Sequence, residues 1–299
     1  MNQRNWFLKT GGIIVGQQGP FELGRLTRAP SVPQLAYLRG NQELLRTRPC
    51  VGIVGTRKPS QTGLKRAFEY AAALSSAGSL IVSGGAIGID LAAHQGALSV
   101  GCETLVVLGD PVYVNKDERP ARILALKPAH LVSTVTTCGP GTPVSRTLFV
   151  SRNQYIAALS DAILIIEGTL NSGTLHTARY AQKIGVPVWV VPGDPENILA
   201  SAANSLLQAG QARALLNLEA LLESLGLGRM RRAACDGLSE GSRLAKVFRE
   251  HGGRATLDLL CNALKLPVSQ IQSDLLELEL MGTITREGAE LIWQNRSLS

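Results

Sequence analysis

The chain has 299 residues, 45% of them hydrophobic and 18% charged, which predicts a globular protein with one large domain and one small domain. No apolar run approaches the roughly 18 residues that a membrane span requires, and the N-terminus lacks an apolar core of signal-peptide length. We therefore expect a cytoplasmic protein with no membrane partner.

The positive charge is concentrated near the N-terminus. Residues 1–60 carry nine Lys and Arg against two Asp and Glu, residues 61–239 carry fourteen against thirteen, and residues 240–299 carry seven against eight. The net charge of +7 therefore belongs to the segment that leads into the first predicted strand. It indicates a polyanionic partner, with a solubilising surface as the alternative.

Candidate disulfides and metal ligands are few. The five cysteines form no Cys-x-x-Cys pair and are typical of buried or free thiols in a reducing compartment. They are Cys50, Cys102, Cys138, Cys235 and Cys261. Asp90 and His94 are four residues apart, but no third ligand lies nearby, so a structural contact between them is favoured over a metal site.

Hydrophobic periodicity predicts alternating strands and helices from residue 51 to residue 225. Residues 1–30 are expected to be irregular, residues 33–40 extended, and Asn41 the cap of a short helix. Strands are expected at 51–54, 80–82, 104–108, 131–134, 162–166 and 186–191, and helices at 63–76, 89–99, 149–160, 172–184, 204–207 and 216–225. This order predicts an α/β fold with an extended Rossmann-like, doubly wound, mostly parallel sheet.

A small second domain is expected at the C-terminus. Three helical runs and two short strand candidates, at 243–251, 256–264, 269–281, 283–285 and 290–293, predict a winged helix. The third run carries three carboxylates and no Lys or Arg, which favours protein contact or packing over groove recognition. The predicted organisation is an N-terminal extension at 1–48 partly packed on the core, an extended Rossmann domain at 49–226, a linker at 227–241 and a winged helix at 242–299.

Turns that follow the first two strands place candidate ligand groups at the carboxyl edge of the sheet, where open α/β sheets bind ligands. The first turn contains Thr56 and Arg57, whose guanidinium suits phosphate. The second turn is one residue short of the dinucleotide fingerprint, because Ser83 stands where its first glycine belongs. Its binding candidates are Ser83, Gly84, Gly85 and Gly88. A nucleotide cofactor remains possible on spacing alone, with Asp110 near the position of a ribose-binding acid.

Two further clusters belong to the same predicted edge. The segment after residue 139 places a phenylalanine among cations, a combination suited to single-stranded nucleic acid, with core and surface packing as the alternative. Its candidates are Arg146, Phe149, Arg152 and Asn153. The turn after the fifth strand would present hydrogen-bond donors at a helix N-terminus, although an ordinary cap explains them nearly as well. Its candidates are Ser172, Gly173 and Thr174.

Recognisable catalytic motifs are missing from the sequence. There is no Gly-x-x-x-x-Gly-Lys-Ser/Thr segment, which excludes the usual P-loop ATPase. No serine or cysteine occupies a nucleophile elbow, and the four histidines pair with nothing obvious. We therefore expect no catalytic residue, no metal and no cofactor.

The motifs together resemble the DNA-processing family known as DprA or Smf, over roughly residues 33–295. The resemblance is carried by Val51–Leu98, Pro140–Pro143, Arg152-Asn153, Glu167, Ser172–Thr174 and Val191–Gly193. It implies a non-enzymatic, homodimeric, single-stranded-DNA-binding protein that protects incoming DNA and helps to load RecA recombinase in natural transformation. It further implies a DNA pocket built on Arg57, Arg146 and Phe149, an accessory winged helix, and dimer contacts near 204–216. Ile87 stands where the family more often has arginine.

An enzyme of another class remains the alternative. Phosphoribohydrolases that process nucleotides share the Rossmann core and resemble the turn that begins at Glu167. Their glutamate after Gly-Thr is missing here, where Leu175, His176 and Thr177 follow the second Gly-Thr.

Overall fold

The computed structural model describes residues 12–16, 24–45, 49–111, 123, 125–139, 142–143, 145–227, 247–248, 251–264, 268, 271–272, 275, 284–288 and 290–293. It divides into two compact units, Met1–Cys235 and Asp236–Ser299, and each is described by itself. Almost all of the predicted linker at 227–241 lies outside the described residues, so the exact domain limits stay a prediction.

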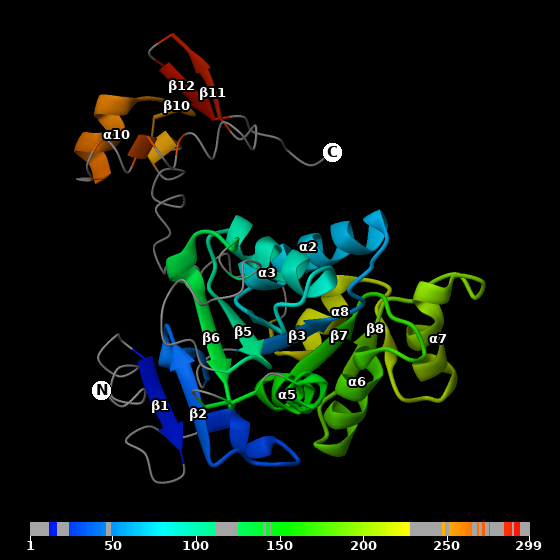
Figure 1. Ribbon diagram of the computed structural model, residues 1–299. Helices are drawn as coiled ribbons and strands as arrows, with labels where there is room; N and C mark the ends of the chain where they lie inside the picture. The colour runs from blue at the N-terminus through cyan, green and yellow to red at the C-terminus, as the bar shows by residue number, and fades with distance from the viewer. Residues whose placement is uncertain are drawn as a thin grey trace. The chain divides into compact units, whose positions relative to one another are not determined.

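The first unit is built on a nine-stranded sheet in the order β1-β2-β6-β5-β4-β3-β7-β8-β9 (Figure 1). Strands β3 to β9 are parallel, whereas β1 and β2 join one edge antiparallel. The strands are β1 (Gly12–Gly16), β2 (Leu35–Arg39), β3 (Cys50–Val54), β4 (Leu80–Ser83), β5 (Thr104–Leu108), β6 (Val132–Thr136), β7 (Ala162–Ile165), β8 (Val188–Val190) and β9 (Arg213–Ala214). The mostly parallel α/β fold is confirmed.

The chain reverses its direction across the sheet between β3 and β7. Strands β4, β5 and β6 extend the sheet on one side of β3, and β7, β8 and β9 extend it on the other. Connections on the two sides of such a switch point diverge, which opens a crevice at the carboxyl ends of the strands. The turns after β3 and β7 meet at this point.

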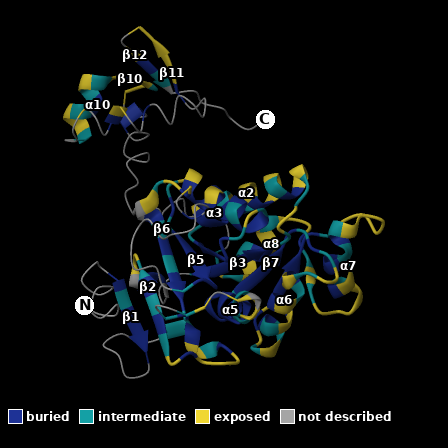
Figure 2. Ribbon diagram, viewed as in Figure 1, coloured by how far each residue is buried: buried dark blue, intermediate teal, exposed yellow. Residues whose placement is uncertain are grey.

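Helices cover both faces of the sheet (Figure 1). One face carries α2 (Gln61–Ser76), α3 (Ile89–Ser99) and α8 (Leu218–Ser224), and the other carries α5 (Arg146–Leu159), α6 (Gly173–Lys183) and α7 (Ser201–Gln208). Short 3-10 helices lie at η1 (Gly24–Arg28), η2 (Gln42–Leu45), η4 (Ala129–Leu131) and η5 (Ile198–Ala200). Every residue of β3, β4, β5 and β7 is buried (Figure 2), as expected for parallel strands that are covered on both faces.

The segment before β3 is anchored by one carboxylate. Asp161 forms ion pairs of 3.0 Å with Arg25 and 3.3 Å with Arg28, and it also accepts a hydrogen bond from the backbone N–H of Cys50 at 2.9 Å. This ties η1 to the start of β3 and to the turn before β7. Some of the N-terminal basic charge therefore serves packing.

Three local predictions need correction in this unit. Residues 12–16 were expected to be irregular but form β1, because their backbone pairs with β2 along five residues of each strand. The short strand β9 was not predicted. Cys102 is disulfide-bonded, so the expectation of five thiols is wrong for that residue, whereas Cys50, Cys138 and Cys261 are free.

The second unit has the winged-helix character that the sequence predicts. Its sheet has the order β10-β12-β11, with β10 (Arg254–Thr256), β11 (Ile284–Glu287) and β12 (Glu290–Trp293) all antiparallel. Helix α10 (Leu257–Leu264) packs its apolar side into a separate core around Phe248. Strand β10 was not predicted, and most of the acidic run 269–281 lies outside the described residues. No helix in the described part of either unit is long and apolar enough to cross a membrane.

Candidate nucleic-acid interface

Three turns at the carboxyl edge of the sheet are joined by backbone hydrogen bonds. The N–H of Thr56, in the turn after β3, donates to the carbonyl of Glu167 after β7 at 2.8 Å. The carbonyl of Thr56 accepts from the N–H of Ile89, at the start of α3, at 3.3 Å. The turns after β3, β4 and β7 therefore form one continuous surface at the switch point.

The N-terminus of α2 is closed by groups of the protein itself. Ser60 caps the helix by accepting from the N–H of Gly63 at 2.9 Å. The carboxylate of Glu167 accepts from both the N–H and the hydroxyl of Ser60. An anionic side chain thus already occupies the positive end of α2, so the side chains of this turn become its main groups for an external anion. Among them Arg57 and Lys58 are exposed.

The glycine-rich turn after β4 is also satisfied from within. Its N–H groups at Gly84 and Ala86 hydrogen-bond to the buried carboxylate of Asp90 in the first turn of α3. Ser83 is fully buried and donates its hydroxyl to the carbonyl of Ile53 at 2.5 Å. A dinucleotide fingerprint would direct such N–H groups at a pyrophosphate, whereas here they bind a carboxylate of the chain.

The same turn lies directly over a buried cation. Arg152 of α5 is 5% exposed, and its Nη1 donates to the carbonyl of Val107 in β5 at 2.6 Å. A Cβ atom on Gly84 would overlap the guanidinium of Arg152, so only glycine allows this approach. Burial raises the pKa of Asp90, and the positive charge of Arg152 opposes that rise. Arg152 therefore lies beneath the surface as an internal counterion.

Helix α5 also brings Phe149 and Asn153 to this edge. Phe149, half-buried, packs against Gly109 just after β5, where an added Cβ would lie 2.8 Å from the ring. Asn153 is buried and donates its amide to the carbonyl of Gly173 at 3.2 Å, which links α5 to the start of α6. Arg146 is the first residue of α5, and its side chain lies outside the described residues.

The N-terminus of α6 is the open helix end of the interface. Ser172 occupies its N-cap position without forming a side-chain cap bond. In the described part of the chain, the buried Ser172 hydroxyl has no hydrogen-bond partner at all. Gly173 is exposed beside it, and Thr174 is buried. A helix N-terminus without a side-chain cap is suited to an anion.

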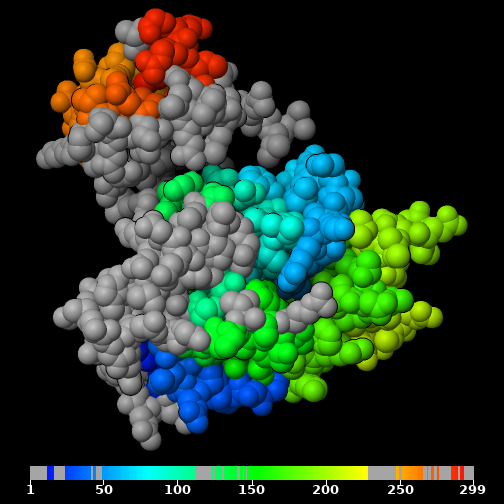
Figure 3. Space-filling view, viewed as in Figure 1, coloured from blue at the N-terminus to red at the C-terminus, as the bar shows by residue number. Residues whose placement is uncertain are grey.

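The predicted residues therefore separate into two groups. Thr56, Arg57, Phe149, Ser172 and Gly173 lie at least partly at the surface. The buried members support them from below, and the left-handed glycines Gly85 (φ +65°) and Gly88 (φ +93°) shape the turn. The buried members are Ser83, Gly84, Gly85, Arg152, Asn153 and Thr174. In the space-filling view the surface of α2 and α3 lies beside that of α5 and α6 (Figure 3).

The sequence reasoning missed two residues that matter at this edge. Lys58 is exposed and directly follows Arg57. Its place beside a predicted phosphate-binding arginine was the signal in the sequence that could have identified it. Glu167, which was named in the family resemblance without being given a role, closes the N-terminus of α2 from the end of a distant strand. Ile87, in place of an arginine, is an exposed apolar residue with 58% of its surface accessible.

The Asp90–His94 contact expected from sequence is not formed. His94 Nδ1 hydrogen-bonds to the hydroxyl of Thr104 at 2.7 Å, and that hydroxyl donates to the carbonyl of Ile81. His94 Nε2 has no hydrogen-bond partner among the described residues. Burial, aided by the charge of Arg152, lowers the pKa of His94 to about 3, so the ring is neutral. The described residues contain no cluster of three or more potential metal ligands.

Comparison with known proteins assigns the chain to a family. Residues 19–226 match the model of DNA recombination-mediator protein A, and residues 254–289 match the DprA winged helix domain. The chain belongs to the DNA recombination-mediator protein A family, known as DprA or Smf. A putative DNA processing protein DprA of Mycobacterium tuberculosis is 31% identical over 77% of this chain, which spans 60% of that relative's length.

Two solved structures support the assignment. The X-ray structure of DprA from Streptococcus pneumoniae has a TM-score of 0.63 and 27% identity, covering 74% of this chain and 78% of that one. DprA from Helicobacter pylori, whose structure describes a single-stranded-DNA binding mode, has a TM-score of 0.59 and 27% identity. That match covers 67% of this chain and 91% of the Helicobacter chain.

The buried histidine predicts a specific acid sensitivity. Between pH 6.5, the ordinary pKa of histidine, and about 3, the unfolded chain binds a proton that folded His94 rejects. The free energy of unfolding should therefore fall by about 1.4 kcal/mol per pH unit on acidification through this range. His94→Asn should be less stable at neutral pH and should lack this part of the slope, as measured by urea unfolding.

Exposed His176 on α6 provides the matched control. His176→Asn should retain the slope of the unchanged protein. Asp90 is present in the unchanged protein and in both variants. Its titration therefore contributes equally to the three slopes that are compared. An unchanged slope in His94→Asn would contradict the assignment.

Proposed function

We propose that this protein binds single-stranded DNA along the carboxyl edge of its parallel sheet. The observation that carries the proposal is the exposed pair Arg57 and Lys58 at a switch point where the N-terminus of α6, with Gly173 exposed, has no side-chain cap. Both features suit phosphate oxygens. Membership of the DprA family and the described binding mode of the Helicobacter relative support the choice of ligand.

The site residues then take different parts in binding. Arg57 and Arg146 would pair with phosphates, and Phe149 would stack on a base, the combination that single strands need. Thr56 and Gly173 would donate hydrogen bonds to the backbone of the strand, and Ser172 would lie beside them at the N-cap of α6. The buried residues Ser83, Gly84, Arg152, Asn153 and Thr174, with the shaped glycines Gly85 and Gly88, would hold these groups in place. The proposal is one of binding, with no catalytic step.

Replacing Arg57 tests the proposal most simply. Arg57→Ala should weaken binding of an oligothymidylate about tenfold at moderate salt, because a charge-assisted hydrogen bond to phosphate is lost. The dependence of log K on log salt should become shallower by about 0.7 for each phosphate contact removed. Fluorescence anisotropy with single-stranded and duplex DNA measures both, and the single strand should bind more tightly.

Lys183→Ala is the matched control, since Lys183 is an exposed cation at the far end of α6, away from the carboxyl edge. It removes the same charge and should leave affinity nearly unchanged. Equal losses in the two variants would indicate a nonspecific charge effect and would overturn the proposed site.

We further propose that the protein acts as a homodimer. Large apolar side chains are exposed in the segments before and after α7, with Ile198 70% and Leu216 82% accessible, and exposed apolar side chains of this size suit an association surface. Leu216→Glu should shift the mass measured by light scattering at micromolar concentration from dimer to monomer. Val100→Glu, at the C-terminal end of α3, is the control and should remain dimeric. A monomeric unchanged protein would contradict the proposal.

A last proposal concerns recombination. By family membership, we infer that the bound strand is passed to RecA recombinase. The protein should shorten the lag of RecA-dependent ATP hydrolysis on DNA covered by single-strand-binding protein, and Arg57→Ala should do so less well. No effect on the lag by a preparation that binds DNA normally would refute this step.

A further inference from the structure

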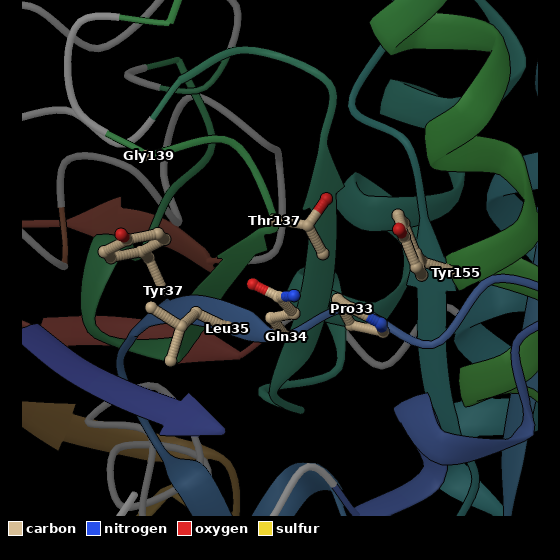
Figure 4. Close-up of a pocket in the computed structure, with 7 residues that line it drawn as sticks. All are labelled: Pro33, Gln34, Leu35, Tyr37, Thr137, Gly139 and Tyr155. Atoms are coloured by element: carbon tan, nitrogen blue, oxygen red, sulfur yellow. The ribbon is translucent and has the colours of Figure 1, made fainter. Parts of the chain in front are cut away.

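An open pocket lies at the same edge of the sheet, outside the site described above. Its volume is about 360 Å³, and it opens between the segment that leads into β2, the end of β6 and the middle of α5 (Figure 4). It is lined by Pro33, Gln34, Leu35, Tyr37, Thr137, Gly139 and Tyr155. None of these lining residues was singled out as a binding candidate from sequence.

Two tyrosines stand at opposite sides of this cavity. Figure 4 shows Tyr37 on one side, Tyr155 beside Pro33 on the other, and Gln34 and Thr137 between them. The hydroxyl of Tyr37 lies close to Gly139, where an added Cβ would be 3.2 Å from it. Tyr155 is 8% exposed and interacts with the Thr137 side chain, so it forms the buried wall.

The lining is aromatic and polar but uncharged. Phosphate binding requires cations or a helix N-terminus, and no lining residue supplies either. A nucleobase requires an apolar or aromatic face together with a few hydrogen-bonding groups, which the tyrosines, the amide of Gln34 and the hydroxyl of Thr137 supply. Burial raises the pKa of the Tyr155 phenol, so this group stays protonated and able to donate.

The cavity is joined to the main site through the ends of neighbouring strands. Phe149 packs on Gly109, and the carbonyl of Gly109 accepts from the Sγ of Cys138 at 3.7 Å. The adjacent carbonyl of Asp110 accepts from the hydroxyl of Thr136 at 2.8 Å. Thr137 and Gly139, which line the cavity, flank Cys138 in the chain. The distance from β5 across β6 to β2 is two strand spacings, about 10 Å. One or two nucleotides of a single strand can span this distance.

We propose that this cavity is a second base subsite, which accepts a base of the same DNA strand one or two nucleotides beyond the base at Phe149. The inference rests on the proposed function. It extends the proposed DNA-binding surface from the main site across the ends of β5, β6 and β2. A strand long enough to reach the cavity should bind more tightly than one that fills only the main site.

The test compares two oligothymidylates by anisotropy, a short one of about four nucleotides and a longer one of about eight, within the range of single-strand site sizes. A longer strand can bind in more than one position, and its affinity is first divided by the number of those positions. After that correction, the unchanged protein should bind the longer strand about tenfold more tightly than the short one, as expected for one additional stacked base. Tyr37→Leu should abolish the gain while binding the short strand normally. Tyr37→Phe should keep it, because the ring is retained.

Two further variants guard the interpretation. Gln34→Ala changes an exposed side chain, so it should fold normally and should reduce the gain on its own. Tyr70→Leu on α2 removes a half-buried tyrosine that packs against the other core cluster and should leave the gain intact. Thymidine monophosphate, which cannot bridge the sites, should compete equally poorly against the unchanged protein and Tyr37→Leu.

The failures are distinguishable. If the unchanged protein binds both strands but the gain survives Tyr37→Leu and Gln34→Ala, the subsite is overturned and the main site stands. If the unchanged protein binds neither strand, the proposed function itself is overturned. Preferential competition by the mononucleotide, lost in Tyr37→Leu, would identify a separate nucleotide site and would also overturn the proposal.

Discussion

The candidate interface depends on one buried electrostatic interaction, that of Arg152 with Asp90. The guanidinium bonds to the carbonyl of Val107, lies against Gly84 and opposes the raised pKa of Asp90, while Asp90 holds the N–H groups of the glycine-rich turn. Helix α5, strand β5 and the turn after β4 are thereby tied at one point. Replacing Arg152 would remove its hydrogen bond to Val107 and the positive charge that opposes the raised pKa of Asp90, and should therefore destabilise the sheet edge.

This internal pairing explains why a Rossmann-like sheet edge need not hold a nucleotide cofactor. The N-terminus of α2 and the turn that precedes α3 are bound by the protein's own carboxylates, Glu167 and Asp90. The turns they close are rigid supports, and the turn after β3 presents cations through its side chains. Helix α6, whose N-cap Ser172 forms no side-chain cap bond, keeps its N-terminal backbone donors for a ligand. An extended ligand that touches several points at the edge suits this arrangement better than one compact pyrophosphate.

Much of the fold could be predicted because its strongest signals are local. The strand at 104–108 and the helix at 89–99 have their predicted limits, since each combines an apolar run with a clear glycine boundary. Strand β1 could not be predicted, because its pairing with β2 is decided by distant residues. For the same reason, sequence could place Arg152 near a phosphate site but could not show that it is buried with Asp90 as its counterion. The cavity between Tyr37 and Tyr155 joins residues more than a hundred positions apart and leaves no local pattern.

Hydrogen–deuterium exchange with and without single-stranded DNA tests the central claim most directly, because it reports on the interface without altering it. The amides of Arg57, Gly173 and Thr174 should gain protection on binding, and the gain should diminish as salt rises. The amides at Gly84 and Ala86, already bonded to Asp90, should be slow to exchange in both states. Protection confined to residues 254–293, with no change at the carboxyl edge of the large sheet, would contradict the claim.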